Sequence, residues 1–333
     1  MDHTAFVLAA GLGTRLQPLT WKRPKALVPV CGTPMLDIAL AGCAAAGHRR
    51  VVVNAFHHAD LLAAHIRKRE RAPGVTVVDE PELLGTGGGL RAARHLMAPR
   101  FVVVNADVLH DVDLVGLLAA VPAGGAAMAL RPHAPDAERY GAVLMDSEGV
   151  VVRLSHVGEI PAQGEVVQGT HFTGVHALDR SLLDAVPDGP QCIVRTAYRG
   201  ALPARALRGV LHRGTWLDVG DPAAYLAANL AVLCTTMSVP HDVGAGAAYM
   251  RGPRGERGRA PSGVTIEGSV WIGVGASVEP GAVLRDTVVG AGAAISSQTR
   301  MTRCVVWDRR EVGGGTWSDA IFHDGGYLPL GGA

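Results

Sequence analysis

The chain begins with MDHTAFVLAAGLGTRLQPLTWKRPKAL (residues 1–27), the stretch that decides the fold. A short apolar run, residues 6–10, ends in Gly11-Leu-Gly13-Thr-Arg15. Glycines directly after a buried strand let backbone N–H groups come close to a bound group, which is most often a phosphate. Arg15 and Lys25, which follow the glycines, add positive charge suited to such an anion. The opening stretch therefore indicates a strand, a glycine-rich turn and a phosphate-binding segment.

The same strand-then-helix pattern continues through the first two thirds of the chain. Further apolar runs of strand length occupy residues 50–54, 75–79 and 101–105, and helix formers fill 35–46, 59–69 and 88–96. This alternation predicts an α/β fold with a Rossmann-like, mostly parallel sheet. Ligands gather at the carboxyl ends of such strands, so we expect the Gly11 loop and Asn105-Ala106-Asp107 to meet at one crevice.

The C-terminal third has a different pattern. Residues 238–262 are rich in Gly, Pro and Arg and have no period, which indicates a linker. A six-residue rhythm of small and apolar side chains follows, in two registers: Val264, Val270, Ala276, Ala282, Val288 and Ala294, and then Ile266, Ile272, Val278 and Leu284. Such repeats are typical of a left-handed parallel β-helix. We expect an N-terminal domain over 1–236, a linker over 237–262, a β-helix over 263–320 and a tail over 321–333.

Composition narrows the functional class. The 333 residues are 48% hydrophobic and 18% charged, which describes a compact globular protein. A net charge of +1 gives no general attraction to nucleic acid or to an anionic membrane. The sequence shows no leader pattern and no apolar stretch near the ~20 residues that span a bilayer. Its five cysteines form no Cys-x-x-Cys pair. We expect a cytoplasmic protein without nucleic-acid or membrane partners.

Two longer motifs identify a family. LAAGLGTRLQPLT (residues 8–20) and PKALVPVCGTPM (residues 24–35) resemble the signature of sugar-1-phosphate nucleotidylyltransferases, and in particular mannose-1-phosphate guanylyltransferases. The resemblance implies that residues 1–236 form a catalytic domain that joins a nucleoside triphosphate to a sugar 1-phosphate and releases pyrophosphate. It implies that Arg15 and Lys25 are catalytic. The nucleotide-binding residues that it implies here are Ala9, Ala10, Gly11, Gly13, Thr14 and Arg15. A Walker loop and a dinucleotide fingerprint are both excluded, the second because Leu16 stands where its third glycine belongs.

A second glycine-rich segment follows the strand expected at 75–79. EPELLGTGG (residues 80–88) resembles the family segment that reads the nucleobase. Glycine at these positions lets main-chain N–H and C=O groups reach the edges of a base. The nucleotide-binding residues implied here are Glu80, Leu84, Gly85, Thr86 and Gly87.

Two aspartates are candidate metal ligands. Asp107 ends the expected strand at 101–105 in VVNAD, which is close to a family motif. A carboxylate there is costly unless paired or bound to a cation, and one carboxylate plus nucleotide phosphates commonly holds Mg²⁺. Trp216-Leu-Asp218 resembles the family segment whose aspartate completes the metal site, so the resemblance implies Asp107, also catalytic, and Asp218 as ligands. Asp221, just before Pro222, is expected to cap the next helix.

The acceptor side matches the family less well. Tyr140-Gly141 resembles a family segment that packs near the sugar, and His171–His176 stands where relatives carry other residues. Glu159-Ile-Pro161 replaces a usual Glu-Lys-Pro, so the lysine is missing. The sugar-binding residues that the resemblance implies are Asn105, Gly141, Glu159, His171, Thr173 and Gly174.

Several functional alternatives stay open at this point. The LGTGG loop resembles guanylyl enzymes acting on mannose-type or heptose-type 1-phosphates, but also uridylyl enzymes for N-acetylmuramate 1-phosphate or another hexose 1-phosphate. A non-catalytic regulatory homologue that binds nucleotide sugars is a further alternative. An acyltransferase is disfavoured because residues 263–312 contain no histidine to act as a base, and a pure scaffold would make the motif matches coincidence. Relatives use such a repeat for assembly, so we expect a homo-oligomer formed through it.

Overall fold

The computed structural model describes residues 4–69, 73–132, 142–155, 157–235, 246–253 and 255–331. The chain divides into two compact units, one formed by residues 1–11 and 39–216 and the other by residues 12–38 and 217–333. The signature segment 12–38 therefore packs with the C-terminal part of the chain. The second unit therefore includes residues 12–38 and 217–236, which the sequence analysis had placed in the N-terminal domain over 1–236.

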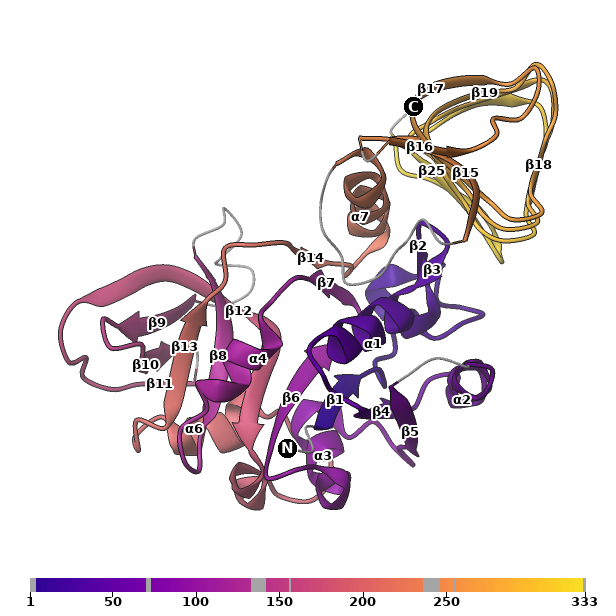
Figure 1. The fold of residues 1–333 in the computed structure, drawn as a ribbon. Helices are drawn as coiled ribbons and strands as arrows, with labels where there is room; N and C mark the ends of the chain where they lie inside the picture. Colours follow the sequence, from indigo (N-terminus) through magenta and orange to yellow (C-terminus); the bar gives the residue numbers. More distant parts are fainter. Residues whose placement is uncertain are drawn as a thin grey trace. The chain divides into compact units, whose positions relative to one another are not determined.

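The first unit is built on one large sheet (Figure 1). Its centre is β1 (Thr4–Leu8), which pairs in parallel with β4 (Arg50–Ala55) and β6 (Arg100–Asn105), and β4 pairs in parallel with β5 (Gly74–Asp79). The other half is mostly antiparallel around β12 (Val166–Asp179), which pairs with β6, β8 and β9. The remaining strands are β7 (Val108–His110), β8 (Ala126–Pro132), β9 (Ala142–Asp146), β10 (Val151–Leu154), β11 (Gly158–Glu159) and β13 (Leu207–Leu211). The predicted α/β fold is confirmed.

Helices and turns connect these strands. They are α1 (Met35–Ala45), α2 (Ala59–Arg67), α3 (Gly85–Ala92), α4 (Leu114–Ala119) and α6 (Arg199–Ala201), with single turns at Arg94–Leu96, Arg180–Ala185 and Val194–Tyr198. The core between the layers contains Phe6, Phe101, Val103 and Tyr198, each fully buried. Strands buried on both faces read as continuous apolar runs, which is why β1, β4 and β6 were visible in the sequence.

The order of the strands locates a binding crevice. From β1 the chain passes to β4 and β5 on one side, and it then returns to β6 on the other side of β1. Ligands bind outside the carboxyl ends of the strands at such a reversal. The ends of β1 and β6 therefore flank the expected binding position in the first unit.

The second unit contains the signature segment, helix α7 (Pro222–Cys234) and the C-terminal strands. The signature segment forms single turns at Thr14–Leu16 and Lys25–Leu27 and a small hairpin, β2 (Pro29–Val30) with β3 (Thr33–Pro34), while β14 (Trp216–Asp218) precedes α7. The Asp221 carboxylate accepts a hydrogen bond of 2.8 Å from the Ala224 N–H, with Pro222 at the first helical position. The predicted helix cap is confirmed.

The C-terminal strands stack as coils of a parallel β-helix (Figure 1). Ile266 lies opposite Leu284, which in turn lies opposite Met301. Each coil thus takes up about three six-residue repeats. The strands are β15 (Ala247–Gly252), β16 (Gly255–Gly258), β17 (Thr265–Gly273), β18 (Ser277–Val278), β19 (Val283–Val289), β20 (Ala294–Ile295), β21 (Thr299–Thr302), β22 (Val305–Val306), β23 (Glu311–Val312), β24 (Gly315–Ser318), β25 (Ala320–His323) and β26 (Gly326–Pro329).

Antiparallel strands continue the main sheet of the β-helix at both ends. The hairpin β15–β16 pairs with β17, and β26 pairs with β25. The first hairpin lies in the range expected to be a linker, and β26 lies in the range expected to be a tail. Sequences such as GERG in β16 carry no apolar stripe, so these strands form because a neighbouring strand offers backbone partners.

Membrane insertion through helices finds no support in this fold. Within the described ranges, no helix combines the length and the apolar character that crossing a bilayer requires.

Candidate functional site

The expected binding position in the first unit lies where β1 and β6 end together. Leu8 is paired with Asn105, and the Ala106 N–H donates a 3.0 Å hydrogen bond to the Leu8 carbonyl. The segments that contain Gly11 and Asp107 leave these adjacent strand ends. A Cβ added at Gly11 would meet no further atom of the described chain within 4 Å, so the loop faces open space. The two segments that the sequence placed at one crevice are therefore neighbours at the carboxyl edge.

A buried polar network fixes this edge. The Ala9 N–H donates to Asn54 Oδ1 at 2.7 Å, and Asn54 Nδ2 donates to Glu80 Oε1 at 2.7 Å. Glu80 Oε2 accepts from the Leu84 N–H at 2.9 Å, and Glu80 is only 6% exposed. Both carboxylate oxygens of Glu80 are thus used inside the protein, where they hold the 80–84 loop against the end of β1. Asn54 was missed by the sequence analysis, although a polar residue ending the run RVVV was a signal.

The glycines after Leu84 lie against the backbone of residues 189–193. An added Cβ would come within 2.7 Å of the Gln191 carbonyl oxygen at Gly85 and within 2.9 Å of the Ile193 nitrogen at Gly87. The Gly87 N–H donates to the Gln191 carbonyl at 2.8 Å, and Thr86 Oγ1 accepts from the Ile193 N–H at 3.1 Å. These glycines permit a close approach of backbone to backbone. Direct contact of Leu84, Gly85, Thr86 and Gly87 with a nucleobase stays a prediction.

Asn105 and Gly174, two predicted sugar-binding residues, are in contact. Gly174 has a φ of +83°, and an added Cβ would lie 2.6 Å from Asn105 Nδ2. Only glycine therefore lets β12 pass the Asn105 side chain.

The other predicted sugar-binding residues lie in different surroundings. Thr173 Oγ1 donates to the Ala129 carbonyl at 2.8 Å and is used within the sheet. His171 is fully buried, with its ring edge-to-face against Trp216 at 5.0 Å. Glu159 is exposed on the edge strand β11, 3.7 Å from Arg153. Gly141 lies outside the described residues. Of this predicted set, the structure brings together Asn105 and Gly174.

Two buried histidines of the first unit stay neutral near pH 7. Burial lowers the pKa of His176 from its ordinary value of 6.5 to about 3, and its Nδ1 is hydrogen-bonded to the Tyr198 hydroxyl. Burial and then the neighbouring His212 lower the pKa of His110 to about 4, while Asp111 opposes this shift. Neither histidine is exposed, so both support the fold.

Arg15 and Asp218 converge in the second unit. A Cβ added at Gly220 would lie 3.1 Å from Asp218 Oδ2 and 3.3 Å from Arg15 Nη1. Glycine at this position therefore makes room for a carboxylate and a guanidinium together. Of the predicted catalytic and metal-binding residues in this unit, these two are brought together by the fold.

Lys25 lies on the turn that closes the glycine motif. Gly13 has a φ of +65°, and an added Cβ would lie 2.8 Å from Thr20 Cγ2 and 3.2 Å from Lys25 Cβ. The Thr20 hydroxyl donates to the Gly13 carbonyl at 2.9 Å, which ties the two ends of the loop together. Position 13 requires glycine because its φ is positive and because there is no room for a Cβ atom. Since glycine has no side chain, Lys25 can pack beside the loop.

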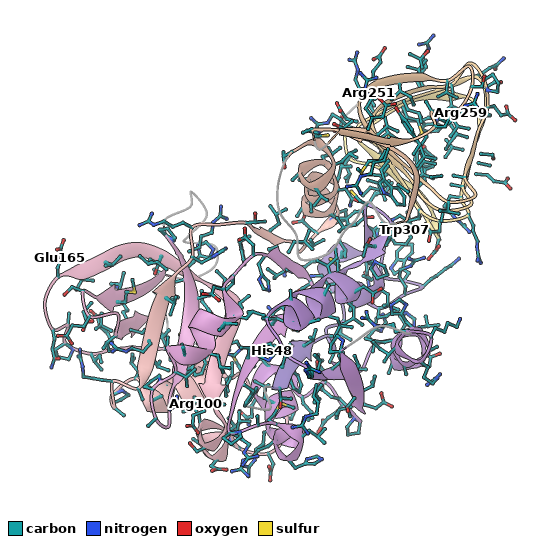
Figure 2. All side chains as sticks on the ribbon, viewed as in Figure 1. His48, Arg100, Glu165, Arg251, Arg259 and Trp307 are labelled. Carbon is teal, nitrogen blue, oxygen red and sulfur yellow. The ribbon has the colours of Figure 1, made fainter. Side chains whose placement is uncertain are left out.

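The signature segment is anchored to α7 and to the β-helix. The Tyr225 hydroxyl donates to the Pro29 carbonyl at 2.6 Å and accepts from Trp307 Nε1 at 2.9 Å. The Arg23 guanidinium lies 4.1 Å from the centroid of the Trp307 ring and forms a 2.5 Å ion pair with Asp324 (Trp307 is labelled in Figure 2). These residues were missed by the sequence analysis, because nothing local links position 23 to positions 225, 307 and 324.

Two more contacts complete this anchor. The Cys31 N–H donates to Asn229 Oδ1 at 2.8 Å, and Asn229 is fully buried. Gly32 has a φ of +73°, and an added Cβ would lie 2.2 Å from the Trp271 ring. Glycine at position 32 therefore lets the Trp271 ring pack directly against the backbone of the signature segment.

The metal-binding prediction rests on Asp107 in the first unit and Asp218 in the second. Among the residues that the structure describes, no three His, Cys, Asp or Glu side chains gather as a metal cluster. A site with one or two carboxylates and substrate phosphates does not need such a cluster. Both aspartates are partly exposed, as ligands that meet an incoming nucleotide must be.

Comparison with known proteins adds the family. Residues 4–234 match the family model described as nucleotidyl transferase. The chain is 37% identical over 242 residues to the N-acetylmuramate alpha-1-phosphate uridylyltransferase of Caulobacter vibrioides, covering 68% of this chain and 95% of the relative. It is 30% identical over 319 residues to the mannose-1-phosphate guanylyltransferase of Mycobacterium tuberculosis, covering 93% of this chain and 81% of the relative.

Solved structures agree on the fold. The crystal structure of HddC from Yersinia pseudotuberculosis complexed with GMP-PN matches with a TM-score of 0.57 and 22% identity, covering 68% of this chain and 98% of that one. The family model spans more than half of the chain, and a relative that is 37% identical is covered over 95% of its length. The chain belongs to the nucleotidyl transferase family and is a sugar-1-phosphate nucleotidylyltransferase.

Proposed function

We propose that this enzyme transfers a guanylyl group from GTP to a mannose-type or heptose-type 1-phosphate. The length of the alignment with one relative supports GTP as the nucleotide. The mannose-1-phosphate guanylyltransferase of Mycobacterium tuberculosis aligns over 93% of the chain, so its match extends into the C-terminal repeats. The alternative is UTP with N-acetylmuramate 1-phosphate or another hexose 1-phosphate, which is favoured by the higher identity of 37% to a uridylyltransferase over 68% of the chain.

The chemistry of the reaction is a displacement at the α-phosphorus of the nucleotide. An oxygen of the sugar 1-phosphate forms the new P–O bond while the bond to the β-phosphate oxygen breaks, and pyrophosphate leaves in line. Because the attacking oxygen is already anionic, no general base is required. Catalysis then depends on positioning and on neutralising charge.

Arg15 and Lys25 supply that charge in our proposal. Arg15 neutralises the leaving pyrophosphate, and Lys25 holds a phosphate at the reacting centre. The packing of Lys25 beside Gly13 supports this role, since it restricts the lysine to the glycine loop. The loop residues Ala9, Ala10, Gly11 and Thr14 present backbone groups to the nucleotide.

We assign Mg²⁺ to Asp107 and Asp218. Hard carboxylate oxygens fit this ion, and the space that Gly220 leaves beside Asp218 Oδ2 supports the assignment. When bound, Mg²⁺ would offset the negative charge of the phosphoryl groups. Removal of divalent ions with EDTA should abolish turnover, and added Mg²⁺ should restore it.

The acceptor sugar is proposed to lie near Asn105 and Gly174. Their mutual contact at the end of β6 supports this position. His171 and Thr173 would then act by shaping β12 behind the sugar, since both side chains are buried. Glu159 is the member of the proposed set that lies on an edge strand.

A substrate screen tests the whole assignment. Five nucleoside triphosphates are combined with a panel of sugar 1-phosphates, and pyrophosphate release is measured. Highest kcat/KM for GTP with a mannose-type or heptose-type acceptor supports the proposal. Preference for UTP with N-acetylmuramate 1-phosphate selects the alternative.

Assembly and location complete the proposal. We propose a homo-oligomer formed through the β-helix, working in the cytoplasm with nucleotide and sugar phosphate and without nucleic-acid or membrane partners. The flanking hairpins leave β16 and β26 as strand edges, which offer backbone groups to a second copy. Light scattering on the full chain would contradict this assembly if it gave the mass of a monomer.

A further inference from the structure

The last part of the β-helix contains a cavity that the transfer reaction does not use. Its volume is about 500 Å³, and it lies between the chain around β23 and the β25–β26 hairpin. Residues that line it include two arginines, a glutamate, a histidine and two aromatic rings: Arg309, Arg310, Glu311, His323, Phe322 and Tyr327. All of them belong to the second unit, within the β-helix itself.

The two arginines of this cavity lack protein partners. Some arginines of the unit are paired, such as Arg285 with Glu267 at 2.5 Å and Arg303 with Asp319 at 2.7 Å. In the part of the chain that the structure describes, neither Arg309 nor Arg310 forms an ion pair or a side-chain hydrogen bond. Two adjacent guanidinium groups without carboxylates are suited to a phosphate.

One donor of Arg310 is also buried. Its Nε atom is shielded from solvent and has no hydrogen-bond partner among the described residues. A buried donor without a partner destabilises the folded protein. A bound anion in the cavity would satisfy it.

The surroundings of His323 place Arg310 at the cavity. The pKa of His323 is lowered, first by its burial, and Arg23, Lys22 and Arg310 act in the same direction against Asp324. Arg23 is paired with Asp324 at 2.5 Å.

The backbone at Arg309 turns a corner of the β-helix. Its φ is +58°, in the left-handed region, and the equivalent corners of the two preceding coils are Gly275 and Gly292. Residues with a side chain adopt this region less readily than glycine does. The chain thus carries a guanidinium where its own repeat uses glycine.

The other wall of the cavity is aromatic. The rings of Phe322 and Tyr327 are stacked, with centroids 5.9 Å apart and planes at 27°. Tyr327 is 55% exposed, so a planar base could stack on this pair. The Glu311 carboxylate would repel a bare phosphate, but it can accept hydrogen bonds from the amino or imino groups of a base or from ribose hydroxyls.

We propose that this cavity is a second nucleotide site, in which Arg309 and Arg310 bind the phosphates and the Phe322–Tyr327 pair stacks the base. It is distinct from the glycine-loop segment that carries Arg15 and Lys25. A nucleoside diphosphate, alone or as part of a nucleotide sugar, has the charge and the planar group that the cavity lining matches.

Hydrogen exchange on the full-length enzyme tests the proposal because it reports the location of binding. GDP, UDP, guanosine and inorganic pyrophosphate are titrated separately to millimolar concentration, and exchange is followed in peptides covering residues 305–329. GDP or UDP should slow exchange there in a saturable manner. Pyrophosphate lacks the base and guanosine lacks the phosphates, so each should bind more weakly than GDP.

Variants separate this site from the catalytic segment. The double variant Arg309→Gln/Arg310→Gln should raise the Kd seen in these peptides by about tenfold or more. Arg300→Gln, an exposed arginine on β21 away from the cavity, is the matched control and should leave it unchanged. Tyr327→Ala should weaken the binding of GDP and leave the binding of pyrophosphate unchanged. Because the ring is exposed, the variant should fold.

Three outcomes would overturn the proposal. One is unchanged exchange over 305–329 with both nucleotides. Another is equal protection in the double variant and the wild type, which would mean that the effect spreads from the catalytic site. The last is pyrophosphate binding as tightly as GDP, which would exclude a role for the base.

Discussion

Replacing Tyr225 with phenylalanine should weaken the second unit by an amount that the structure lets us estimate. The hydroxyl is fully buried and joins three segments, since it donates to the Pro29 carbonyl and accepts from Trp307 Nε1. Tyr225→Phe removes no carbon atoms, so it creates no large cavity. It leaves one buried acceptor and one buried donor without a partner.

Each buried polar group left unsatisfied costs roughly 1–3 kcal/mol, and the loss of the buried hydroxyl itself offsets part of this. We therefore expect Tyr225→Phe to lower the free energy of unfolding by about 2–4 kcal/mol. For a chain of this size that corresponds to a fall in Tm of roughly 3–6 °C. Because Pro29 belongs to the segment that carries Lys25, we also expect a lower kcat at temperatures where the variant is folded.

Thermal unfolding followed by near-UV circular dichroism measures the effect. Tyr327→Phe is the matched control, because that ring is 55% exposed and its hydroxyl has no hydrogen bond to any residue that the structure describes. A Tyr225→Phe protein whose Tm equals that of Tyr327→Phe would show that the hydroxyl does not stabilise the anchor.

Three further predictions follow from the site and the core. Lys25→Ala should lose roughly 3–4 kcal/mol of transition-state stabilisation with little change in Tm, and near-normal turnover would contradict its role. Asp107→Asn and Asp218→Asn should each abolish Mg²⁺-dependent activity, and the double variant should be scarcely worse, whereas multiplying losses in kinetic assays would exclude a shared site. The pKa of His176 is about 3 when folded and 6.5 when unfolded, so the unfolded chain binds more protons between these values. Stability should therefore fall as pH drops below about 6.5, by about 1.4 kcal/mol per pH unit, and urea unfolding of His176→Gln should show a smaller slope than the wild type. An unchanged slope in His176→Gln would show that His176 does not cause the pH dependence of stability.

Local sequence was enough to predict the architecture of both parts. The β-branched runs around Phe6 and Val103 mark strands buried on both faces, and their alternation with helices predicts the parallel half of the sheet. The antiparallel half around β12 was not predicted. The six-residue stripe through Ile266 and Leu284 predicts stacked coils because its period is that of the coil faces. Gly13 and the Asp221 cap are also local, since each depends on the φ or the N–H groups of its nearest neighbours. The motifs also identified the family before any contact was known.

Contacts between distant positions could only come from the tertiary structure. The strands β16 and β26 form because neighbouring strands offer partners, so their own sequences predict a linker and a tail. Gly85 and Gly87 lie against residues 189–193, and no local pattern relates these two segments. The Tyr225 hydroxyl donates a hydrogen bond to the Pro29 carbonyl, although the two residues are 196 positions apart in the sequence. Periodicity and propensity describe how a residue meets its near neighbours, while the satisfaction of a buried polar group depends on whichever segment the fold brings beside it.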